Sequence, residues 1–178
     1  GKVFHLDNQQ GKETVHALDA ATRKALWSAT LDDAFKDGQT AAGPRCSAVV
    51  DGDRVYVQSC KGELQCLDAA TGKAAWRTNY VKDFGATFIG EKGQATGASR
   101  HGNNGAPLVD GDRLLACVGG PEAGVVCFDK KTGKPVWKSQ SDVPGYAGPV
   151  VATIAGVKQA VAFTAEGVIG LDAAPLRA

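Results

Sequence analysis

Residues Cys66 to Trp76 read CLDAATGKAAW, and closely similar stretches occur elsewhere in the chain. ALDAATRKALW spans Ala17 to Trp27, and CFDKKTGKPVW spans Cys127 to Trp137. A fourth copy begins at Gly170 as GLDAAPLRA. A period of about 50 residues is typical of proteins built from repeated supersecondary units. The chain is therefore predicted to be a repeat protein.

Each repeat reads as four short strands joined by glycine and aspartate turns. A second motif, DGDR, precedes two of the copies and supplies a two-residue turn with glycine first. In the second repeat the expected strands are Arg45–Val50, Val55–Cys60, Leu64–Asp68 and Ala74–Tyr80. In the first repeat, Val3–Leu6 reads as the second strand of a unit.

Four antiparallel strands in each repeat are the signature of a β-propeller blade. A stack of sandwiched sheets is the alternative, but it would not explain why tryptophan recurs at one place in every repeat. The predicted fold class is all-β, a partial β-propeller of about three and a half four-stranded antiparallel blades. The expected boundaries are part of blade 1 at 1–31, blade 2 at 44–80, a long loop at 81–105, blade 3 at 106–140 and part of blade 4 at 146–178.

The composition argues against several classes of function. The net charge is +1 and no basic run appears, so no nucleic-acid partner is expected. The longest apolar stretch, near Val150 to Val157, is far too short for a membrane span. The chain has no methionine and begins at Gly1, which suggests a trimmed or processed piece, and we expect the native object to be longer.

The repeated motif resembles the tryptophan-docking motif of the PQQ-like (quinoprotein-type) β-propeller repeat family. In that family the tryptophan lies between neighbouring blades and bonds a backbone carbonyl, while a small residue at the first motif position admits the ring. The aspartate and threonine are expected to bond backbone groups of the turn, and the glycine to take a positive φ. Arg23 replaces that glycine in the first copy. The matching residues are Asp19, Thr22, Trp27, Asp68, Thr71, Gly72, Trp76, Asp129, Thr132, Gly133 and Trp137.

The cysteines and the turn glycines carry no expected chemistry. Hairpin registers place Cys46 opposite Ser59 and Cys66 opposite Val57, too far apart for a disulfide within the blade. All five cysteines are predicted to be small buried hydrophobic residues, and no spacing suggests a metal site. ATGK lacks the full phosphate-loop pattern. It should lie at the end of the blades opposite the ligand funnel of the family, with Lys73 in solvent.

The long connection after Trp76 holds the most polar cluster of the chain. Its candidate ligand or partner residues are Ser99, Arg100, His101, Asn103 and Asn104. Long loops are often functional, but an ordinary solvated connector is the alternative. His101 has no aspartate partner at a telling spacing, and Asp7–Thr14 reads as a plain polar hairpin loop.

Three functions are compatible with these residues. The first is a non-catalytic binding or scaffold segment. The second is a fragment of a PQQ-dependent alcohol or sugar dehydrogenase, and the third is an outer-membrane-assembly-type propeller that grips an extended peptide. No cofactor is predicted for this segment, because all three tryptophans belong to docking motifs and no carboxylate cluster for Ca²⁺ stands out; PQQ and Ca²⁺ remain possible in a longer parent. Expected partners are further blades, a second copy, or a protein or peptide. The family resemblance implies a periplasmic or secreted protein.

Overall fold

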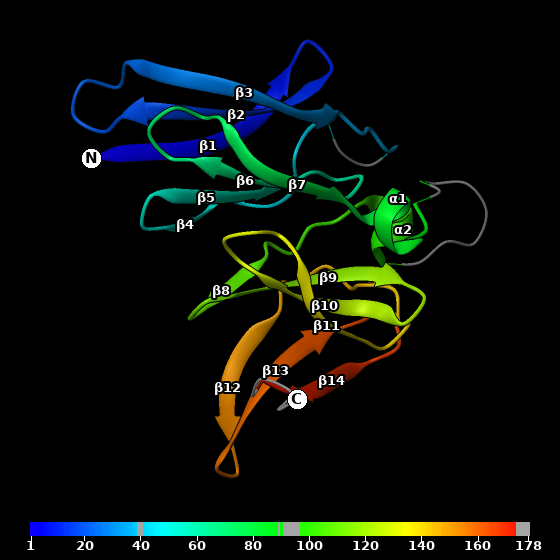
Figure 1. The fold of residues 1–178 in the computed structure, drawn as a ribbon. Helices are drawn as coiled ribbons and strands as arrows, with labels where there is room; N and C mark the ends of the chain where they lie inside the picture. Colours follow the sequence, from blue (N-terminus) through cyan, green and yellow to red (C-terminus); the bar gives the residue numbers. More distant parts are fainter. Residues whose placement is uncertain (39–40, 89, 91–96, 174–178) are drawn as a thin grey trace.

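Four antiparallel sheets follow one another along the chain in a computed structural model that describes residues 1–38, 41–88, 90 and 97–173. Figure 1 shows the sheets fanned out in sequence order from blue to red, which is the arrangement of propeller blades. The predicted all-β fold class is confirmed.

The blades consist of three, four, four and three strands in the described part of the chain. Blade 1 contains β1 (Lys2–Gln9), β2 (Lys12–Asp19) and β3 (Ala25–Asp33). Blade 2 contains β4 (Val49–Asp51), β5 (Arg54–Gln58), β6 (Glu63–Asp68) and β7 (Ala74–Asn79). Blade 3 contains β8 (Leu108–Asp110), β9 (Arg113–Gly120), β10 (Ala123–Asp129) and β11 (Pro135–Ser139). Blade 4 contains β12 (Val150–Ile154), β13 (Val157–Phe163) and β14 (Val168–Asp172).

Two expected loops contain regular structure instead. The hairpin expected as a loop at Asp7–Thr14 is almost entirely strand, because Gln10 and Gly11 at positive φ make a two-residue turn that suits the twist of the strands. The connection at 81–105 contains the short helices α1 (Tyr80–Phe84) and α2 (Gly97–His101). The side chain of Asn79 accepts hydrogen bonds from the first turn of α1, and this cap ends the strand expected to reach Tyr80.

The register of β5 against β6 differs by one residue from the sequence-based prediction. Tyr56, rather than Val57, lies opposite Cys66. The reason is a three-residue turn in which Gly62 has a φ of 93° and the Ser59 amide donates to the Glu63 carbonyl. Since side chains alternate between faces, Tyr56 and Cys66 share one face of the blade. Cys46 lies in the β3–β4 connection, outside the strands, and its thiol donates to the Gln58 carbonyl.

The core consists of the layers between consecutive blades rather than one central cluster. One face of blade 1 packs on blade 2, the other face of blade 2 packs on blade 3, and blade 3 packs on blade 4 in the same way. Each tryptophan belongs to one of these layers. The residue directly opposite it on the neighbouring strand is Ala17, Cys66 or Cys127, and all three are buried.

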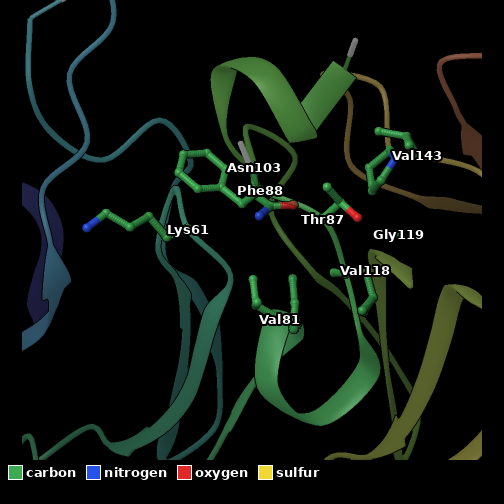
Figure 2. A pocket seen from close by; sticks show the side chains of 11 residues that line it. Lys61, Val81, Thr87, Phe88, Asn103, Val118, Gly119 and Val143 are labelled. Atoms are coloured by element: carbon green, nitrogen blue, oxygen red, sulfur yellow. The ribbon is translucent and has the colours of Figure 1, made fainter. Parts of the chain in front are cut away.

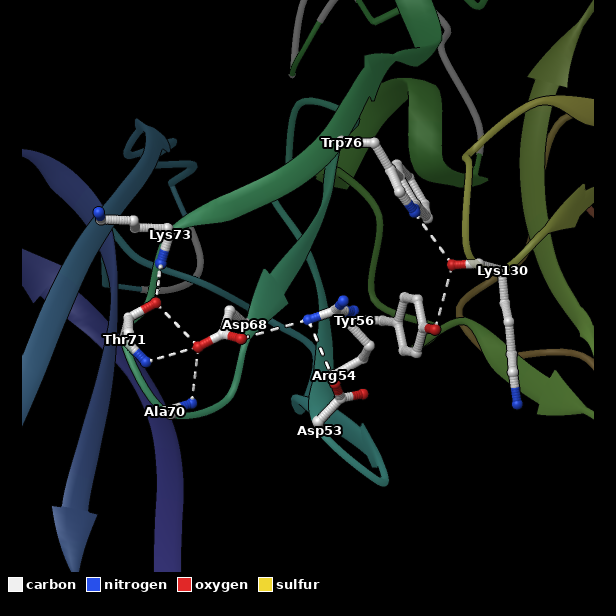
Figure 3. Close-up of polar contacts among 9 residues, drawn as sticks. All are labelled: Asp53, Arg54, Tyr56, Asp68, Ala70, Thr71, Lys73, Trp76 and Lys130. Atoms are coloured by element: carbon white, nitrogen blue, oxygen red, sulfur yellow. Dashed lines mark hydrogen bonds and ion pairs between the residues drawn. The ribbon is translucent and has the colours of Figure 1, made fainter.

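In blades 1 to 3 the turn after the third strand of the repeat is held by its aspartate and threonine. In Figure 3, one carboxylate oxygen of Asp68 accepts hydrogen bonds from the amides of Ala70 and Thr71 and from the Thr71 hydroxyl. Asp19 and Asp129 make the same set of bonds. The threonine side-chain and backbone hydrogen bonds lower the pKa of Asp68 below its ordinary value. The turn is therefore tied most strongly when this aspartate is ionised.

Each glycine of this turn lies directly beneath the tryptophan of the preceding blade. Gly72 has a φ of 72°, and a Cβ at this position would lie 2.6 Å from a ring carbon of Trp27. At Gly133 the corresponding distance to Trp76 is 2.5 Å. The Nε1 of Trp27 donates to the Ala69 carbonyl in the same turn, at 3.3 Å.

The second tryptophan makes the equivalent bond one blade further on. The Nε1 of Trp76 donates to the carbonyl of Lys130 at 3.0 Å, and the hydroxyl of Tyr56 donates to the same oxygen (Figure 3). Trp137 packs against blade 4, and residues 174–178, the end of the fourth motif copy, lie outside the described residues. Arg23 takes the glycine's place in blade 1 with a φ of 62°, and its side chain is exposed.

Gly72→Ala should destabilise the protein far more than Gly52→Ala. Both glycines have positive φ, so an added Cβ costs about 1–2 kcal/mol in either turn. Only at Gly72 does the new carbon also meet Trp27, which should add about 1–3 kcal/mol of overpacking. Urea unfolding of the two variants measures the difference. Equal losses of unfolding free energy in the two variants would show that the Trp27 ring does not need the space left by the missing Cβ of Gly72.

Candidate functional site

The long connections and the hairpin turns between the second and third strands gather at one end of the blades, which we call the loop end. It comprises the β3–β4, β7–β8 and β11–β12 connections with the β1–β2, β5–β6 and β9–β10 turns. Backbone bonds join the two groups: Ala34 donates to Gly11, Asn103 to Cys60 and Gly124 to Gln140. The α1 and α2 helices lie at this end, on the right of Figure 1.

The ATGK turns lie at the opposite end, as predicted. The Ala69 amide donates to the Asp53 carbonyl, so this turn packs beside the DGDR turn of its own blade. Lys73 is exposed there.

Three polar side chains meet at the loop end, and we call them the Asp37 cluster: Asp37, Arg45 and His101. One carboxylate oxygen of Asp37 lies 2.6 Å from the Arg45 guanidinium and 3.2 Å from Nδ1 of His101. The Asp37 side chain is only 1% exposed. Arg45 also donates to the His101 carbonyl at 2.5 Å. A carboxylate buried this deeply is stable only when charges and donors surround it, as they do here.

Aromatic rings surround the Asp37 cluster. The guanidinium carbon of Arg45 lies 5.3 Å from the centre of the Phe35 ring, within the range of a cation–π contact. The ring of His101 meets that of Tyr146 edge-to-face at 5.9 Å. Tyr146 belongs to the β11–β12 connection and is 47% exposed. The cluster thus joins the β3–β4 and β7–β8 connections directly, and Tyr146 adds the third.

The predicted loop residues occupy different environments. Asn103 is buried, and both its amide nitrogen and its Nδ2 donate to the Cys60 carbonyl, so it fixes the connection to blade 2. The Nε of Arg100 and the Oδ1 of Asn104 are buried without a hydrogen-bond partner in the described part of the chain. Ser99 falls within α2, but its side chain lies outside the described residues. The assignment of these residues to a ligand stays a prediction.

Sequence reasoning missed the aspartate partner of His101. Asp37, Arg45 and Tyr146 lie far from His101 in sequence and meet it only because three connections converge at one end of the fan. The sequence shows no aspartate at a telling spacing from His101, and the partner in the structure, Asp37, is 64 residues away. A pairing of this kind leaves no signature in local spacing.

A second buried carboxyl group, that of Glu13, holds the β5–β6 turn of the loop end. Glu13 is fully buried and accepts a hydrogen bond from the Cys60 amide at 3.1 Å. Burial raises the pKa of Glu13 above its ordinary value. The Cys60 thiol donates to the Gly43 carbonyl, so the β5–β6 turn is tied to two elements of the neighbouring blade and connection.

The five cysteines are all free thiols, as predicted, and four of them are buried while Cys46 is half-buried. Burial raises the pKa of Cys46 and of Cys117 to about 12, and that of Cys66 to about 11. Burial also raises the pKa values of Cys60 and Cys127. Thiols that remain protonated at neutral pH are poor nucleophiles, so these side chains serve packing.

A small cavity opens between α1, β9 and the residues before β8. Figure 2 shows Val81 and Val118 lining it together with Thr87 and Asn103. Its volume is about 10 Å³, which is near the minimum for a single water molecule. This cavity cannot hold an organic cofactor in the arrangement described.

Metal-ligand geometry occurs at a different place. Within the described residues, one group of three such side chains lies close enough to share an ion: His5, Asp7 and His16, on blade 1. The carboxylate of the loop end, Asp37, is instead committed to Arg45 and His101. No helix in the described part of the chain is long and apolar enough to cross a membrane.

Comparison with known proteins identifies the relatives of this chain. A quinohemoprotein alcohol dehydrogenase of Comamonas testosteroni is 35% identical over 140 residues, covering 74% of this chain and 17% of the dehydrogenase. The outer membrane protein assembly factor BamB of Burkholderia pseudomallei is 28% identical over 148 residues, covering 79% of this chain and 31% of that protein. The chain thus spans less than a third of these relatives.

The same relationship appears in the fold. The crystal structure of BamB from Moraxella catarrhalis superposes with a TM-score of 0.59 at 21% identity, covering 95% of this chain and 46% of that one. A family model described as outer membrane protein assembly factor BamB matches residues 11–175. The chain therefore belongs to the BamB-type family of PQQ-like β-propeller repeats.

Proposed function

We propose that this propeller segment is a non-catalytic binding module whose loop end takes an extended stretch of a partner polypeptide. The observation that carries the proposal is the Asp37 cluster. Its buried carboxylate is used to hold Arg45 and His101, and thereby two connections, in fixed positions. A carboxylate engaged in this way stabilises a surface rather than serving as a general base or a Ca²⁺ ligand.

The groups left at this surface suit peptide recognition. Tyr146 is half-exposed beside His101, and aromatic and arginine side chains are the commonest anchors of protein interfaces. Arg100, in α2 at the same end of the blades, is half-buried rather than fully enclosed. The positive charge of Arg100 favours a partner segment that combines acidic and aromatic residues.

A fragment of a PQQ-dependent dehydrogenase is the second candidate, favoured by the 35% identity to the quinohemoprotein enzyme. Against it stand the positions of the three tryptophans. Trp27 and Trp76 donate to carbonyls of the following blade, and Trp137 packs against blade 4. A planar cofactor would therefore have to stack on residues other than these three tryptophans.

The location proposed for this protein is the periplasm or the exterior of the cell. The support is kinship with a protein named for outer membrane protein assembly. Secretion of a tagged full-length gene product, measured by fractionation, tests this placement.

The binding proposal is tested with a fluorescent peptide of alternating acidic and aromatic residues. We expect saturable binding, and Arg100→Ala should weaken it about tenfold, the loss typical of one charged hydrogen bond. Arg77→Ala is the matched control, because Arg77 is exposed on β7 outside the loop end. No binding, or equal losses in both variants, would overturn the proposal. Saturable binding of PQQ with Ca²⁺ to the same chain would favour the dehydrogenase instead.

Asp37→Ala should lower the free energy of unfolding by about 3–5 kcal/mol, because it leaves the buried Arg45 charge without its carboxylate. Asp53→Ala is the control: its carboxylate lies 3.6 Å from Arg54 and its side chain is 81% exposed, so the change should stay within about 0.5 kcal/mol. Chemical denaturation measures both. A loss below about 1 kcal/mol for Asp37→Ala would show that the cluster does not organise the loop end.

The outer face of blade 4 should make this chain self-associate, as we propose from its apolar surface. Five large apolar side chains are 47% to 66% exposed there: Val150, Ile154, Val157, Phe163 and Val168. In blades 1 to 3 the next blade packs on the equivalent face and buries it. In the isolated chain, a second copy can bury this face of blade 4. Light scattering should show dimers that Val168→Lys abolishes and Leu26→Lys, on blade 1, does not. A wild-type monomer at every concentration contradicts this expectation.

A further inference from the structure

The outer face of blade 1, which points away from blade 2, carries a row of polar side chains beside the exposed Val3 and Leu26, whereas the outer face of blade 4 is mainly apolar. Phe4, Leu6 and Val15 face blade 2. Since side chains alternate along a strand, the residues between them point outward: His5 and Asp7 on β1, and Thr14 and His16 on β2. Ser28 and Thr30 continue this row on β3 and line a hollow with Thr14 and His16. This face is built differently from the layers between blades.

Two histidines meet at the centre of this polar face. His5 and His16 are directly opposite each other on β1 and β2. Their rings stack with centroids 4.8 Å apart and planes 19° from parallel. Asp7 lies two residues after His5 on the same face of β1, and its Oδ1 is 2.8 Å from Nε2 of His16.

The carboxylate of this group is held in place by a further hydrogen bond. Gln9 donates from Nε2 to the second oxygen of Asp7 at 2.6 Å. Burial opposes ionisation of Asp7, but the hydrogen bonds from Gln9 and His16 outweigh it and lower the pKa. Lys12, on the neighbouring strand, is paired with Asp33. A hydrogen bond such as that from Gln9 to Asp7, made by a residue that is not itself a ligand, orients the ligands of protein metal sites.

We propose that His5, Asp7 and His16 bind a divalent transition-metal ion, for which Zn²⁺ is the natural occupant. Their potential ligand atoms all lie within 4.8 Å of one another. Bonds of about 2.0–2.2 Å to a tetrahedral Zn²⁺ bring ligand atoms to a little over 3 Å apart, so only a modest closure is needed. His5 is exposed, so its ring can turn out of the stack on His16 to aim a nitrogen at the same ion.

The ligand set determines the class of metal. Two imidazoles and one carboxylate suit Zn²⁺, Ni²⁺ or Cu²⁺ and are poor ligands for Ca²⁺ and Mg²⁺, which require oxygen ligands. The hollow beside His16 leaves room for water at the fourth position. The site shares no residue with the Asp37 cluster, so it does not depend on the function proposed for the loop end.

Isothermal titration of the full chain with Zn²⁺ tests the site. We expect one ion per chain, and His5→Gln, Asp7→Asn and His16→Gln should each weaken binding at least about tenfold, since even outer-shell changes cost that much. Asp53→Asn is the matched control, because it changes an exposed carboxylate on blade 2 and should leave the affinity unchanged.

Two further measurements keep the outcome decisive. Far-UV circular dichroism of each metal-free variant checks folding, and the exposed His5→Gln should leave the spectrum unchanged. Co²⁺ substitution should give visible absorption bands in the wild type and in Asp53→Asn, and these bands should be lost in His16→Gln. The proposal is overturned if Zn²⁺ does not bind, if Ca²⁺ binds equally well, or if the folded His5 and His16 variants retain wild-type affinity.

Discussion

The packing of a tryptophan ring onto the glycine of the next blade is the contact on which the rest of this structure depends. The ring of Trp27 occupies the space where a Cβ of Gly72 would stand, and its Nε1 donates to the Ala69 carbonyl in the same turn. The ring satisfies its one polar atom while it buries a large apolar area between two sheets. Neither blade could take this position if the turn carried a side chain.

The same contact places constraints on three other parts of a blade. The residue opposite the ring must be small, and the aspartate and threonine must hold the turn in one conformation. Repetition of the contact in the next blade, through Trp76 and Gly133, sets consecutive sheets in the same relation. The connections are then brought together at one end, where the buried Asp37 can meet Arg45 and His101. Local turn chemistry thus determines a long-range charge cluster.

The sequence predicts the features that local chemistry decides. The positive φ of Gly72 and Gly133, the strands on either side of them and the division into blades follow from a motif of eleven residues. The short helix α1 was missed because a side-chain cap at Asn79 overrides the strand pattern. The β5–β6 register was wrong by one residue because the conformation of Gly62, which sets the turn length, is not encoded in the alternation of polar and apolar residues.

The candidate sites depend on contacts between residues distant in sequence, and local patterns reveal these poorly. Asp37 and His101 come from different connections. The pairing of His5 with His16 could have been found from the sequence had Asp7–Thr14 been interpreted as strands around a Gln10-Gly11 turn, because the hairpin register then places the two rings opposite each other. Reading this segment as a polar loop concealed the metal-ligand pattern.

The dependence of the fold on the ring–glycine contact is measured most directly by a double-mutant cycle. The free-energy cost of Gly72→Ala is determined in the wild type and again in a Trp27→Leu background. If the ring occupies the space of the missing Cβ, the cost in the Trp27→Leu background should fall to that of the strained φ alone, about 1–2 kcal/mol. An equal cost in both backgrounds would show that the two residues are not coupled, and would contradict the central role of the ring–glycine contact in this fold.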